Sequence, residues 1–375
     1  MTLVARQPAG KAEGRSSAMV TRALRLDDLP AETYDRFVAS HPQASPYHHR
    51  AWLQATVKAY GHQAWVVSVT RKGEWVGALP VCHMRRPGGG NLVSLPFCDL
   101  GGPLAQDEGV QAALKAGAQT LMDTCGKADM AVRMAGDALT DEQIAEAELS
   151  QSARKVSMLF PLPESSEVLI KSYKPKLRSQ IRKAEKNGLT SRVVTGREGV
   201  EAFYPVFAAN MRRLGSPVHS RAWFRALAEA YGEQMLVGLV YAEQQVVGAG
   251  IVLVSGQKAC IPWASTLAEF NHLAPNMLLY WALLSHVTDA GCEWFDFGRS
   301  TFGEGTYRFK KQWGAKPYGL SWVHWHADGR VTESAVTEPS ATARKLRQFI
   351  EACWQRLPLA IANWLGPRLR KHISL

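Results

Sequence analysis

The sequence predicts an α/β protein in which one unit of mixed sheet and helices occurs twice. Two observations predict this fold class. Residues 45–84 and 216–255 align without a gap at an offset of 171 residues, and 17 of the 40 aligned positions are identical. Each copy also changes its hydrophobic periodicity in the same order, from helical spacing to strand-like alternation. Because solenoid repeats span only ~20–50 residues, this offset indicates a duplicated domain.

Each copy begins with a helix that is followed by a β-hairpin. Apolar residues recur at helical spacing over 50–59 and 221–230, and a Tyr-Gly pair ends each run. Two alternating stretches around a short polar turn follow in each copy, at 65–70 and 75–84, and again at 236–241 and 246–255. The shared pairs His48/His219 and Arg50/Arg221 favour a structural role, since two copies rarely keep the same chemistry.

Each copy then adds a strand, a helix and a further strand. In the second copy these elements are expected at 259–264, 275–290 and 293–298. Pro275 lies in the first turn of this helix and Gly291 lies just past its end, which is the usual asymmetry of helix termini. A hairpin followed by a helix-linked strand predicts a mixed, twisted sheet flanked by helices.

Length and composition are consistent with two folded domains. The chain has 375 residues, of which 46% are hydrophobic, and it carries a net charge of +11, so anionic partners are expected. Six scattered cysteines and the absence of a long apolar run favour a reduced, cytoplasmic protein. The expected segments are a disordered tail, an N-terminal domain, a basic linker helix, a C-terminal domain and a basic amphipathic tail, at 1–20, 21–165, 166–190, 191–330 and 331–375.

Three stretches in this order resemble the FemAB family of tandem, GNAT-like acyltransferase proteins related to the peptidoglycan-bridge aminoacyltransferases. The stretches are LRSQIRKAEKNG (177–188), APNMLLYW (274–281) and FDFG (295–298) with YRFKKQWG (307–314). The resemblance covers roughly residues 25–325 and implies an N-acyl or aminoacyl transferase. The form of residues 210–217, NMRRLGSP, looks most like members encoded with exopolysaccharide and PEP-CTERM (exosortase) systems. Such a relative would act on a cell-envelope or exopolysaccharide precursor.

The segment 294–313 holds the expected catalytic residues. A buried strand over 293–297 should lead into a polar turn over 298–305, followed by an extended segment from Tyr307 to Trp313. Acyl transfer to an amine passes through an oxyanion, and one fixed donor there is worth ~2.7–4 kcal/mol. The resemblance maps the Phe-Lys pair of the family onto Phe309 and Lys310, with Lys310 stabilising this charge. The alternatives are that Lys310 protects a strand edge, or that Lys311 takes its place.

Asp296 is the second catalytic candidate. An acid between Phe295 and Phe297 is poorly solvated, and burial could raise its pKa enough for general-base work. It could instead hold Lys310, Arg299 or the incoming amine, or cap the next turn. No nucleophilic triad is evident, and none is needed if transfer is direct. His324 and His326 alternate on a last strand with Trp322, but without a third ligand no metal site is predicted.

A basic helix supplies the expected phosphate contacts. Seven basic residues and one acid lie between Lys171 and Lys186, and Arg178 and Arg182 occupy a stripe opposite an apolar face. Guanidinium groups match phosphate geometry, so Arg178 and Arg182 are the first candidates. The further substrate-binding candidates are Arg212, Arg213, Tyr47, Arg299, Tyr307, Lys311 and Trp313.

The donor and the partners remain open at this level. No glycine precedes the helix at Pro275, which puts coenzyme A in doubt because backbone amides must approach its pyrophosphate closely. No cofactor is firmly implied. An aminoacyl-tRNA or an acyl thioester could be the donor, and DNA is not expected as a partner. The alternatives to a FemAB-type transferase are a non-catalytic protein that holds a lipid carrier or RNA, and an acyl-CoA-dependent N-acetyltransferase.

The C-terminal segment from residue 340 is amphipathic and basic. It carries seven basic residues and one acid, with apolar residues at helical spacing. It is expected to dock on the protein itself or to lie on an anionic membrane. The second possibility would place the protein peripherally at the inner face of the membrane.

Overall fold

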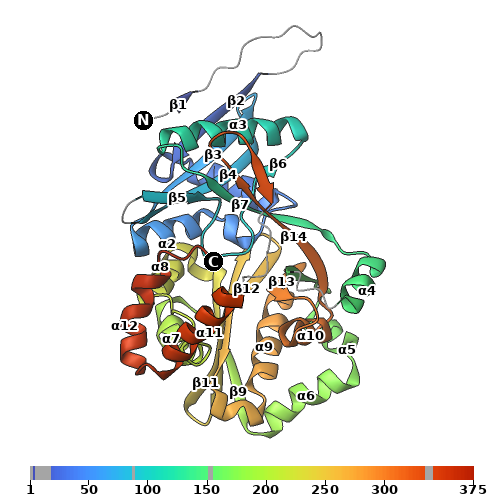
Figure 1. Cartoon of the computed structure of the whole chain (residues 1–375). Coiled ribbons are helices and arrows are strands. Elements are labelled where there is room, and N and C mark those ends of the chain that lie inside the picture. Colours follow the sequence, from blue (N-terminus) through green and yellow to red (C-terminus); the bar gives the residue numbers. More distant parts are fainter. Residues whose placement is uncertain (1–2, 5–17, 87–88, 151–154, 334–340) are drawn as a thin grey trace. The chain divides into compact units, whose positions relative to one another are not determined.

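The computed structural model describes residues 3–4, 18–86, 89–150, 155–333 and 341–375, which form two compact units (Figure 1). Unit 1 contains the described residues up to 135 with 321–333 and 374–375, and unit 2 contains those in 136–320 and 341–373. These limits differ from the expected domains, because the basic segment 166–190 and most of the C-terminal tail belong to unit 2. Most of the N-terminal tail expected at 1–20 lies outside the described residues.

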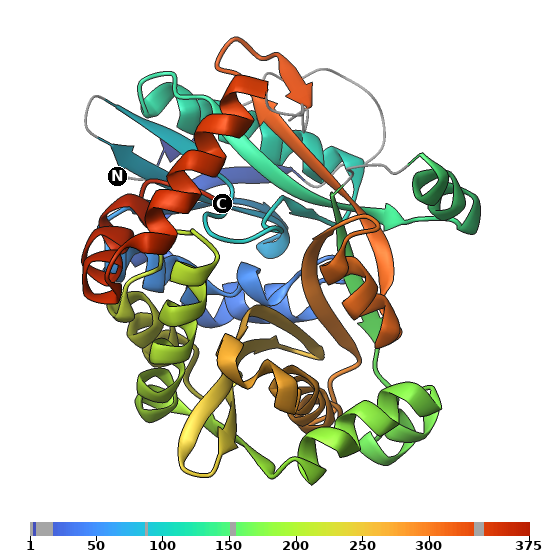
Figure 2. The same ribbon diagram turned by 60° about the horizontal axis from the view of Figure 1, so that its bottom comes forward.

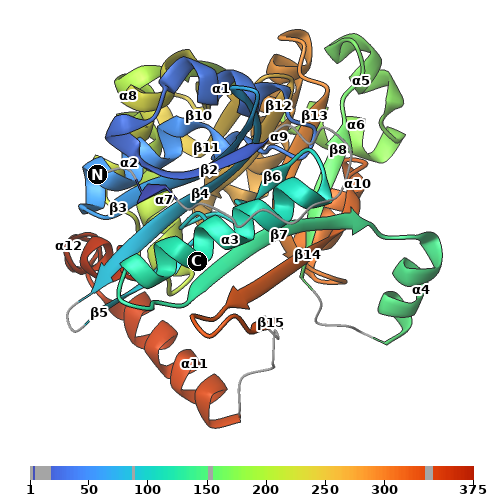
Figure 3. The same cartoon turned by 90° about the horizontal axis from the view of Figure 1, so that it is seen from above.

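Unit 1 is a mixed sheet with helices packed on it. The strand order β1-β2-β3-β4-β5-β7 includes one parallel pair, β5 with β7, and β6 pairs with β4. Helix α3 lies across β2, β3 and β4 (Figure 3). Its bounds and those of the other elements are β1 Leu3–Val4, β2 Met19–Arg25, α1 Ala31–Ser40, α2 Arg50–Tyr60, β3 Gln63–Arg71, β4 Glu74–Arg86, β5 Gly89–Val93, β6 Leu104–Ala105, α3 Glu108–Thr124, β7 Met130–Ala138 and β15 Val331–Glu333.

Unit 2 has the strand order β14-β8-β13-β12-β11-β10-β9, in which β12 and β13 are parallel. Its strands are β8 Lys155–Pro161, β9 Leu189–Thr195, β10 Met235–Ala242, β11 Gln245–Ser255, β12 Lys258–Thr266, β13 Trp294–Thr301 and β14 Lys316–Trp325, which continues into unit 1. Its helices are α4 Asp141–Leu149, α5 Ser166–Ser172, α6 Pro175–Lys186, α7 Gly196–Arg213, α8 Arg221–Tyr231, α9 Pro275–Asp289, α10 Gly305–Gln312, α11 Ala341–Arg356 and α12 Leu359–Arg370.

Helices α7 and α9 cover opposite faces of the unit 2 sheet. A Cβ atom added to Gly199 of α7 would meet the side chain of Val237 on β10 at 3.0 Å. A Cβ atom on the next strand residue, Gly238, would meet Leu283 of α9 at 2.8 Å. Successive strand residues point to opposite faces, so the two helices sandwich the sheet. Glycine at these two positions allows both helices to pack closely on the sheet.

The fold class predicted from the repeat is confirmed. In both units a hairpin leads into a parallel pair that a helix connects: β5, α3 and β7 in unit 1, and β12, α9 and β13 in unit 2. The helices and hairpins expected at the start of each copy lie within two residues of their predicted positions. Local periodicity therefore determined these elements.

The repeated histidines anchor the same turn in both units. The Tyr34 hydroxyl donates to the His48 carbonyl at 2.7 Å, and the Tyr204 hydroxyl donates to the His219 carbonyl at 3.0 Å. Both histidines are buried. Burial, with a smaller contribution from the positive charge of Arg370, holds the pKa of His219 well below its usual range. A neutral, buried ring supports the structural role favoured for this pair.

The repeated arginines pair with an acid on the preceding helix. Arg50 binds Asp35 of α1 at 3.2 Å, and Arg221 binds Glu201 of α7 at 2.5 Å. Arg225 also binds Glu201, at 2.6 Å. This contact and then the hydrogen bond from Arg221 lower the pKa of Glu201 to about 2. The same type of ion pair therefore fastens the first two helices of each copy.

Replacing Glu201 by glutamine should lower the free energy of unfolding by about 1 kcal/mol at pH 7, because these partly exposed pairs are screened by solvent. Since the pKa of Glu201 is lower in the folded protein, its contribution is present above the ordinary glutamate range and is lost as the pH falls towards about 2. Urea unfolding across this range checks the prediction. The exposed Glu233→Gln is the control, and a Glu201→Gln effect independent of pH would contradict it.

Three predictions about local structure are wrong. Residues 307–313 form helix α10 and its C-terminal end, not an extended segment, and strand β13 continues to Thr301. Between Tyr307 and Trp313 the buried residues are Tyr307, Lys310 and Trp313, which follow helical rather than alternating spacing. The expected linker helix is two helices, because Pro175 opens α6 after α5 has ended at Ser172 (Figure 1).

The C-terminal helices dock on unit 2. Both α11 and α12 contact α7, and Trp354 and Ala362 are buried there (Figure 2). A Cβ atom on Gly366 would meet the backbone nitrogen of Val218 at 2.9 Å, so α12 packs closely on the α7–α8 connection. In the part of the chain that the structure describes, no helix combines the length and apolarity needed to cross a membrane.

Candidate active site

The site lies where strands β12 and β13 part. Their parallel pairing runs only from Lys258 opposite Trp294 to Cys260 opposite Asp296, although both strands continue further. On its other side β13 pairs with β8, and the register shifts between Asp296 and Arg299. Gly298, at φ +75°, forms this bulge in a conformation that favours glycine. The FDFG segment thus marks the point at which β13 leaves its neighbour.

Asp296 is buried at this point, with 8% of its surface exposed. Its Oδ1 atom accepts hydrogen bonds from the Gly298 N–H at 2.7 Å and from the Ser157 hydroxyl at 3.0 Å. The flanking rings of Phe295 and Phe297 are buried as well. The carboxyl therefore stabilises the bulge, which is the turn-capping role considered for Asp296. Because the carboxyl is buried, a change of its charge has a large effect on its free energy.

Lys310 brings a positive charge to the same bulge. It lies on α10, is 8% exposed, and its Nζ atom donates to the carbonyls of Gly298 and Arg299, both at 2.9 Å. A buried ammonium group is costly unless hydrogen bonds and nearby negative charge compensate it. The carbonyl oxygens of Gly298 and Arg299 accept two hydrogen bonds from the ammonium group and fix the position of its Nζ atom. Lys310 and Asp296 therefore both bind one short segment of β13.

An aromatic cluster packs against α10. Phe309 packs on Tyr280 of α9 with ring centroids 4.9 Å apart, and Tyr280 stacks on Phe297 at 5.8 Å. Trp313 is fully buried and meets Tyr173 edge-on at 5.4 Å. Phe309 and Trp313 thus position the helix that carries Lys310, and their contacts are those of core residues.

The neighbouring candidates on α10 differ in exposure. Tyr307 is buried against Phe302, with ring centroids 4.5 Å apart. Lys311 is exposed, and its Nζ atom lies 5.8 Å from the centre of the Tyr307 ring. Arg299 is half-buried and contributes its carbonyl to Lys310. Of these three, Lys311 and Arg299 have side chains that a ligand can reach.

Arg178 and Arg182 line a surface pocket of ≈ 480 Å³ on α6. Its other lining residues are Pro175, Ser179, Lys183 and Lys186. The apolar stripe on the other side of α6, which includes Leu177 and Ile181, is buried as expected. Four cationic side chains around one pocket create a positive potential suited to phosphate.

The remaining candidates lie elsewhere. Arg212 donates to the Leu357 carbonyl at 3.0 Å and so fastens the C-terminal helices. Arg213 donates to Asn210 at 2.8 Å on the surface of α7. Tyr47 is buried in unit 1, where its ring meets Trp52 edge-on at 4.9 Å, so it acts as a core residue there.

Sequence reasoning missed three polar residues of the site. Ser157 binds Asp296, and Lys155 donates to Thr301, both from strand β8. Ser300 is buried, and its hydroxyl has no hydrogen-bond partner among the described residues. Strand β8 precedes β13 by about 140 residues, and its sequence KVSMLFP carries no motif, so only the sheet topology brings these residues together.

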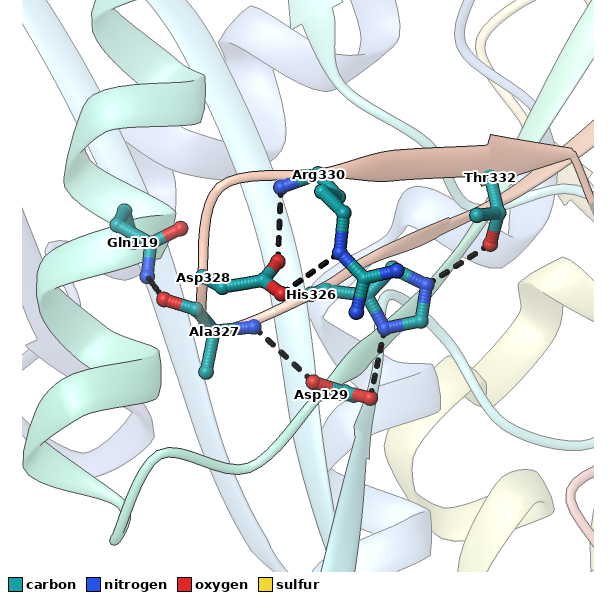
Figure 4. A network of polar contacts seen from close by, with 7 residues as sticks. All are labelled: Gln119, Asp129, His326, Ala327, Asp328, Arg330 and Thr332. Carbon is teal, nitrogen blue, oxygen red and sulfur yellow. Dashed lines mark hydrogen bonds and ion pairs between the residues drawn. The ribbon is translucent and has the colours of Figure 1, made fainter.

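His326 belongs to a turn in unit 1 (Figure 4). Its Nδ1 atom lies 2.9 Å from Asp129 and its Nε2 atom 2.8 Å from the Thr332 hydroxyl. Asp129 also accepts the Ala327 N–H at 3.0 Å. This backbone bond and then His326 lower the pKa of Asp129. Among the residues described, no three His, Cys, Asp or Glu side chains are placed to hold a metal ion.

Comparison with known proteins identifies the class of the second copy. Residues 171–311 match the family model described as an acetyltransferase (GNAT) domain, and this range includes Asp296 and Lys310. The protein is therefore an acyltransferase. A search of curated proteins finds no match.

One of three similar solved structures supports the fold. The crystal structure of FemX is 16% identical, with a TM-score of 0.64 over 86% of this chain and 98% of FemX. L-PGS from Bacillus licheniformis is 12% identical, with a TM-score of 0.49 over 85% and 96%. A tandem GNAT protein from the clavulanic acid biosynthesis pathway is 15% identical, with a TM-score of 0.46 over 85% and 100%. Among these three structures, only that of FemX has a TM-score above 0.5. At this low sequence identity the similarity shows a shared fold and not a shared function.

Proposed function

We propose that the protein transfers an acyl or aminoacyl group directly to an amine of a phosphate-bearing envelope or exopolysaccharide precursor. The observation that carries this proposal is the buried ammonium group of Lys310, which binds the bulge of β13 that Asp296 also binds. Two further facts support it: the acetyltransferase domain spans these residues, and FemX has the same fold.

The residues suit addition of an amine to an acyl carbonyl. The amine nitrogen forms a bond to the carbonyl carbon, the carbonyl oxygen becomes an oxyanion, and the bond from carbon to the oxygen or sulfur of the donor then breaks. Lys310 stabilises the oxyanion, because its charge is fixed before the reaction begins. Asp296 accepts the proton that the amine loses, and the leaving group of the donor takes up a proton in turn. No covalent enzyme intermediate is required.

The donor we propose is an aminoacyl-tRNA, with an acyl thioester as the second candidate. The net charge of +11 suits a polyanionic donor. Residues 268–274, which lead into α9, contain no glycine, and Ala274 adopts φ +64° at the start of the helix. A Cβ atom at this position narrows the approach of a pyrophosphate to the helix N-terminus.

An acyl-CoA-dependent N-acetyltransferase is the rival function, favoured by the description of the matching domain. A thermal shift with coenzyme A separates the two, because a ligand well above its dissociation constant stabilises the folded protein. Mass spectrometry of small molecules that copurify with the protein then identifies the acceptor. A copurifying phosphate-bearing amine without stabilisation by coenzyme A supports our proposal, and stabilisation by coenzyme A supports the rival.

Neutralising Arg178 and Arg182 together should weaken binding of a phosphate-bearing probe at least tenfold. A hydrogen bond to a charged group contributes about 1.5–3 kcal/mol. Losing one such bond, from either arginine, already weakens binding by more than tenfold. Isothermal titration with UDP-N-acetylglucosamine measures the effect for Arg178→Gln/Arg182→Gln. The matched control is Lys171→Gln/Lys176→Gln, which removes the same charge from exposed residues outside the pocket. Equal weakening in both variants would show that net charge, and not this pocket, binds the phosphate.

A further inference from the structure

The last two helices expose a row of large apolar side chains. Of the large apolar residues that are exposed in the described part of the chain, more than half lie between residues 346 and 373. On α11 the exposed fractions are 59% for Leu346, 67% for Phe349 and 53% for Ile350. Their spacing of three and four residues places them on one side of the helix, which we term the α11 face. Contiguous exposed apolar surface of this kind marks an interaction site.

The α11 face is distinct from the surface by which the tail docks on unit 2. Docking uses Trp354, which is buried, and the Leu357 carbonyl, which accepts a hydrogen bond from Arg212. A Cβ atom on Gly215 would meet Glu351 at 2.9 Å, so the adjoining side of α11 is also in close contact. The helix is therefore held in place by one side while the α11 face stays exposed.

The same two helices carry many basic residues. Segment 340–375 carries seven basic residues and one acid. Lys345 and Arg347 flank Leu346 and are exposed. On α12, Trp364 is 60% exposed, and the guanidinium of Arg368 lies 4.1 Å from the centre of its ring. An exposed apolar row with flanking cations and a tryptophan is typical of helices that lie in the interface of an anionic membrane.

We propose that the α11 face binds the surface of an anionic lipid bilayer. The apolar side chains enter the boundary between headgroups and acyl chains, and the flanking cations bind the headgroups. A second copy of the chain is the less suitable occupant, because pairing two such faces would bring two strongly basic segments together. Charge complementarity therefore selects anionic lipid. This inference does not depend on the proposed transferase activity.

Sedimentation of the full chain with vesicles tests the proposal. We expect binding to vesicles of phosphatidylcholine and phosphatidylglycerol, little binding to phosphatidylcholine alone, and weaker binding as salt is raised. The variant Leu346→Ser/Phe349→Ser/Ile350→Ser should bind the anionic vesicles roughly a hundredfold more weakly, because it removes three partly exposed apolar groups. Its melting temperature should be close to that of the wild type, since these side chains are more than half exposed.

A control variant, Val168→Ser/Val331→Ser, removes two exposed apolar residues outside helices α11 and α12 and should bind as the wild type does. Failure of the wild type to bind anionic vesicles would overturn the proposal. Undiminished binding by the triple variant would overturn it too. Self-association of the wild type that the triple variant loses, without binding to vesicles, would assign the α11 face to a second copy instead.

Discussion

Replacing Lys310 by methionine should lower the rate of transfer by about 100- to 1000-fold, the effect of losing one oxyanion donor. The variant should also be less stable by about 1–3 kcal/mol, because the carbonyls of Gly298 and Arg299 lose a buried donor. Only 8% of the surface of Lys310 is exposed, so its substitution should affect stability as well as turnover. Turnover and thermal unfolding are therefore measured on the same preparation.

Lys311→Met is the matched control, since it removes the same charge from the adjacent, exposed position. It should keep most of the activity and the stability. If Lys310→Met lowers the melting temperature while turnover per folded molecule is unchanged, Lys310 is a structural lysine and the catalytic assignment fails. If Lys311→Met loses activity instead, the backup assignment is the correct one.

Replacing Asp296 by asparagine should lower turnover by about 100- to 10,000-fold, the range for loss of a general base. Asparagine keeps an oxygen that can accept the Gly298 N–H and the Ser157 hydroxyl, so the bulge should remain folded. Alanine at this position removes both bonds and should destabilise the protein by about 1–3 kcal/mol as well. Steady-state kinetics and thermal unfolding of the two variants separate the charge of Asp296 from its hydrogen bonds.

Ser157→Ala is the control for Asp296, because it removes one partner of the carboxyl and leaves the charge in place. It should reduce turnover much less than Asp296→Asn does. Full activity in Asp296→Asn would mean that the carboxyl only holds the bulge, and the proton would then have to leave the amine by another route.

The segment around Lys310 shows how far sequence reasoning reaches. Tyr307, Phe309 and Trp313 alternate as in a strand, yet Tyr307, Lys310 and Trp313 also recur every three residues, as in a helix. Over seven residues the two periods cannot be separated from the pattern alone. Packing on the Tyr280 ring and the bonds from Lys310 to β13 favour the helix. The sequence therefore identified the motif but predicted the wrong secondary structure for it.

Long-range contacts of the site left no pattern in the sequence. Ser157 reaches Asp296 only because β8 lies beside β13 in the sheet, and no local signal encodes that pairing. The basic stripe of α6 was evident from its spacing, and Pro175 was a local signal for the break that the single expected helix overlooked, whereas the pocket around Arg178 appeared only in three dimensions.

The sequence by itself determined that one α/β unit occurs twice, where its helices and hairpins lie, and which short segment of the second copy carries the candidate chemistry. These features follow from hydrophobic periodicity and helix-end residues, which act over a few neighbouring positions. The tertiary structure decided that α10 is a helix, that Lys310 and Asp296 share one bulge, and that the tail docks by one side with its apolar α11 face exposed. These features depend on which distant segments pack together, and packing is a property of the whole fold.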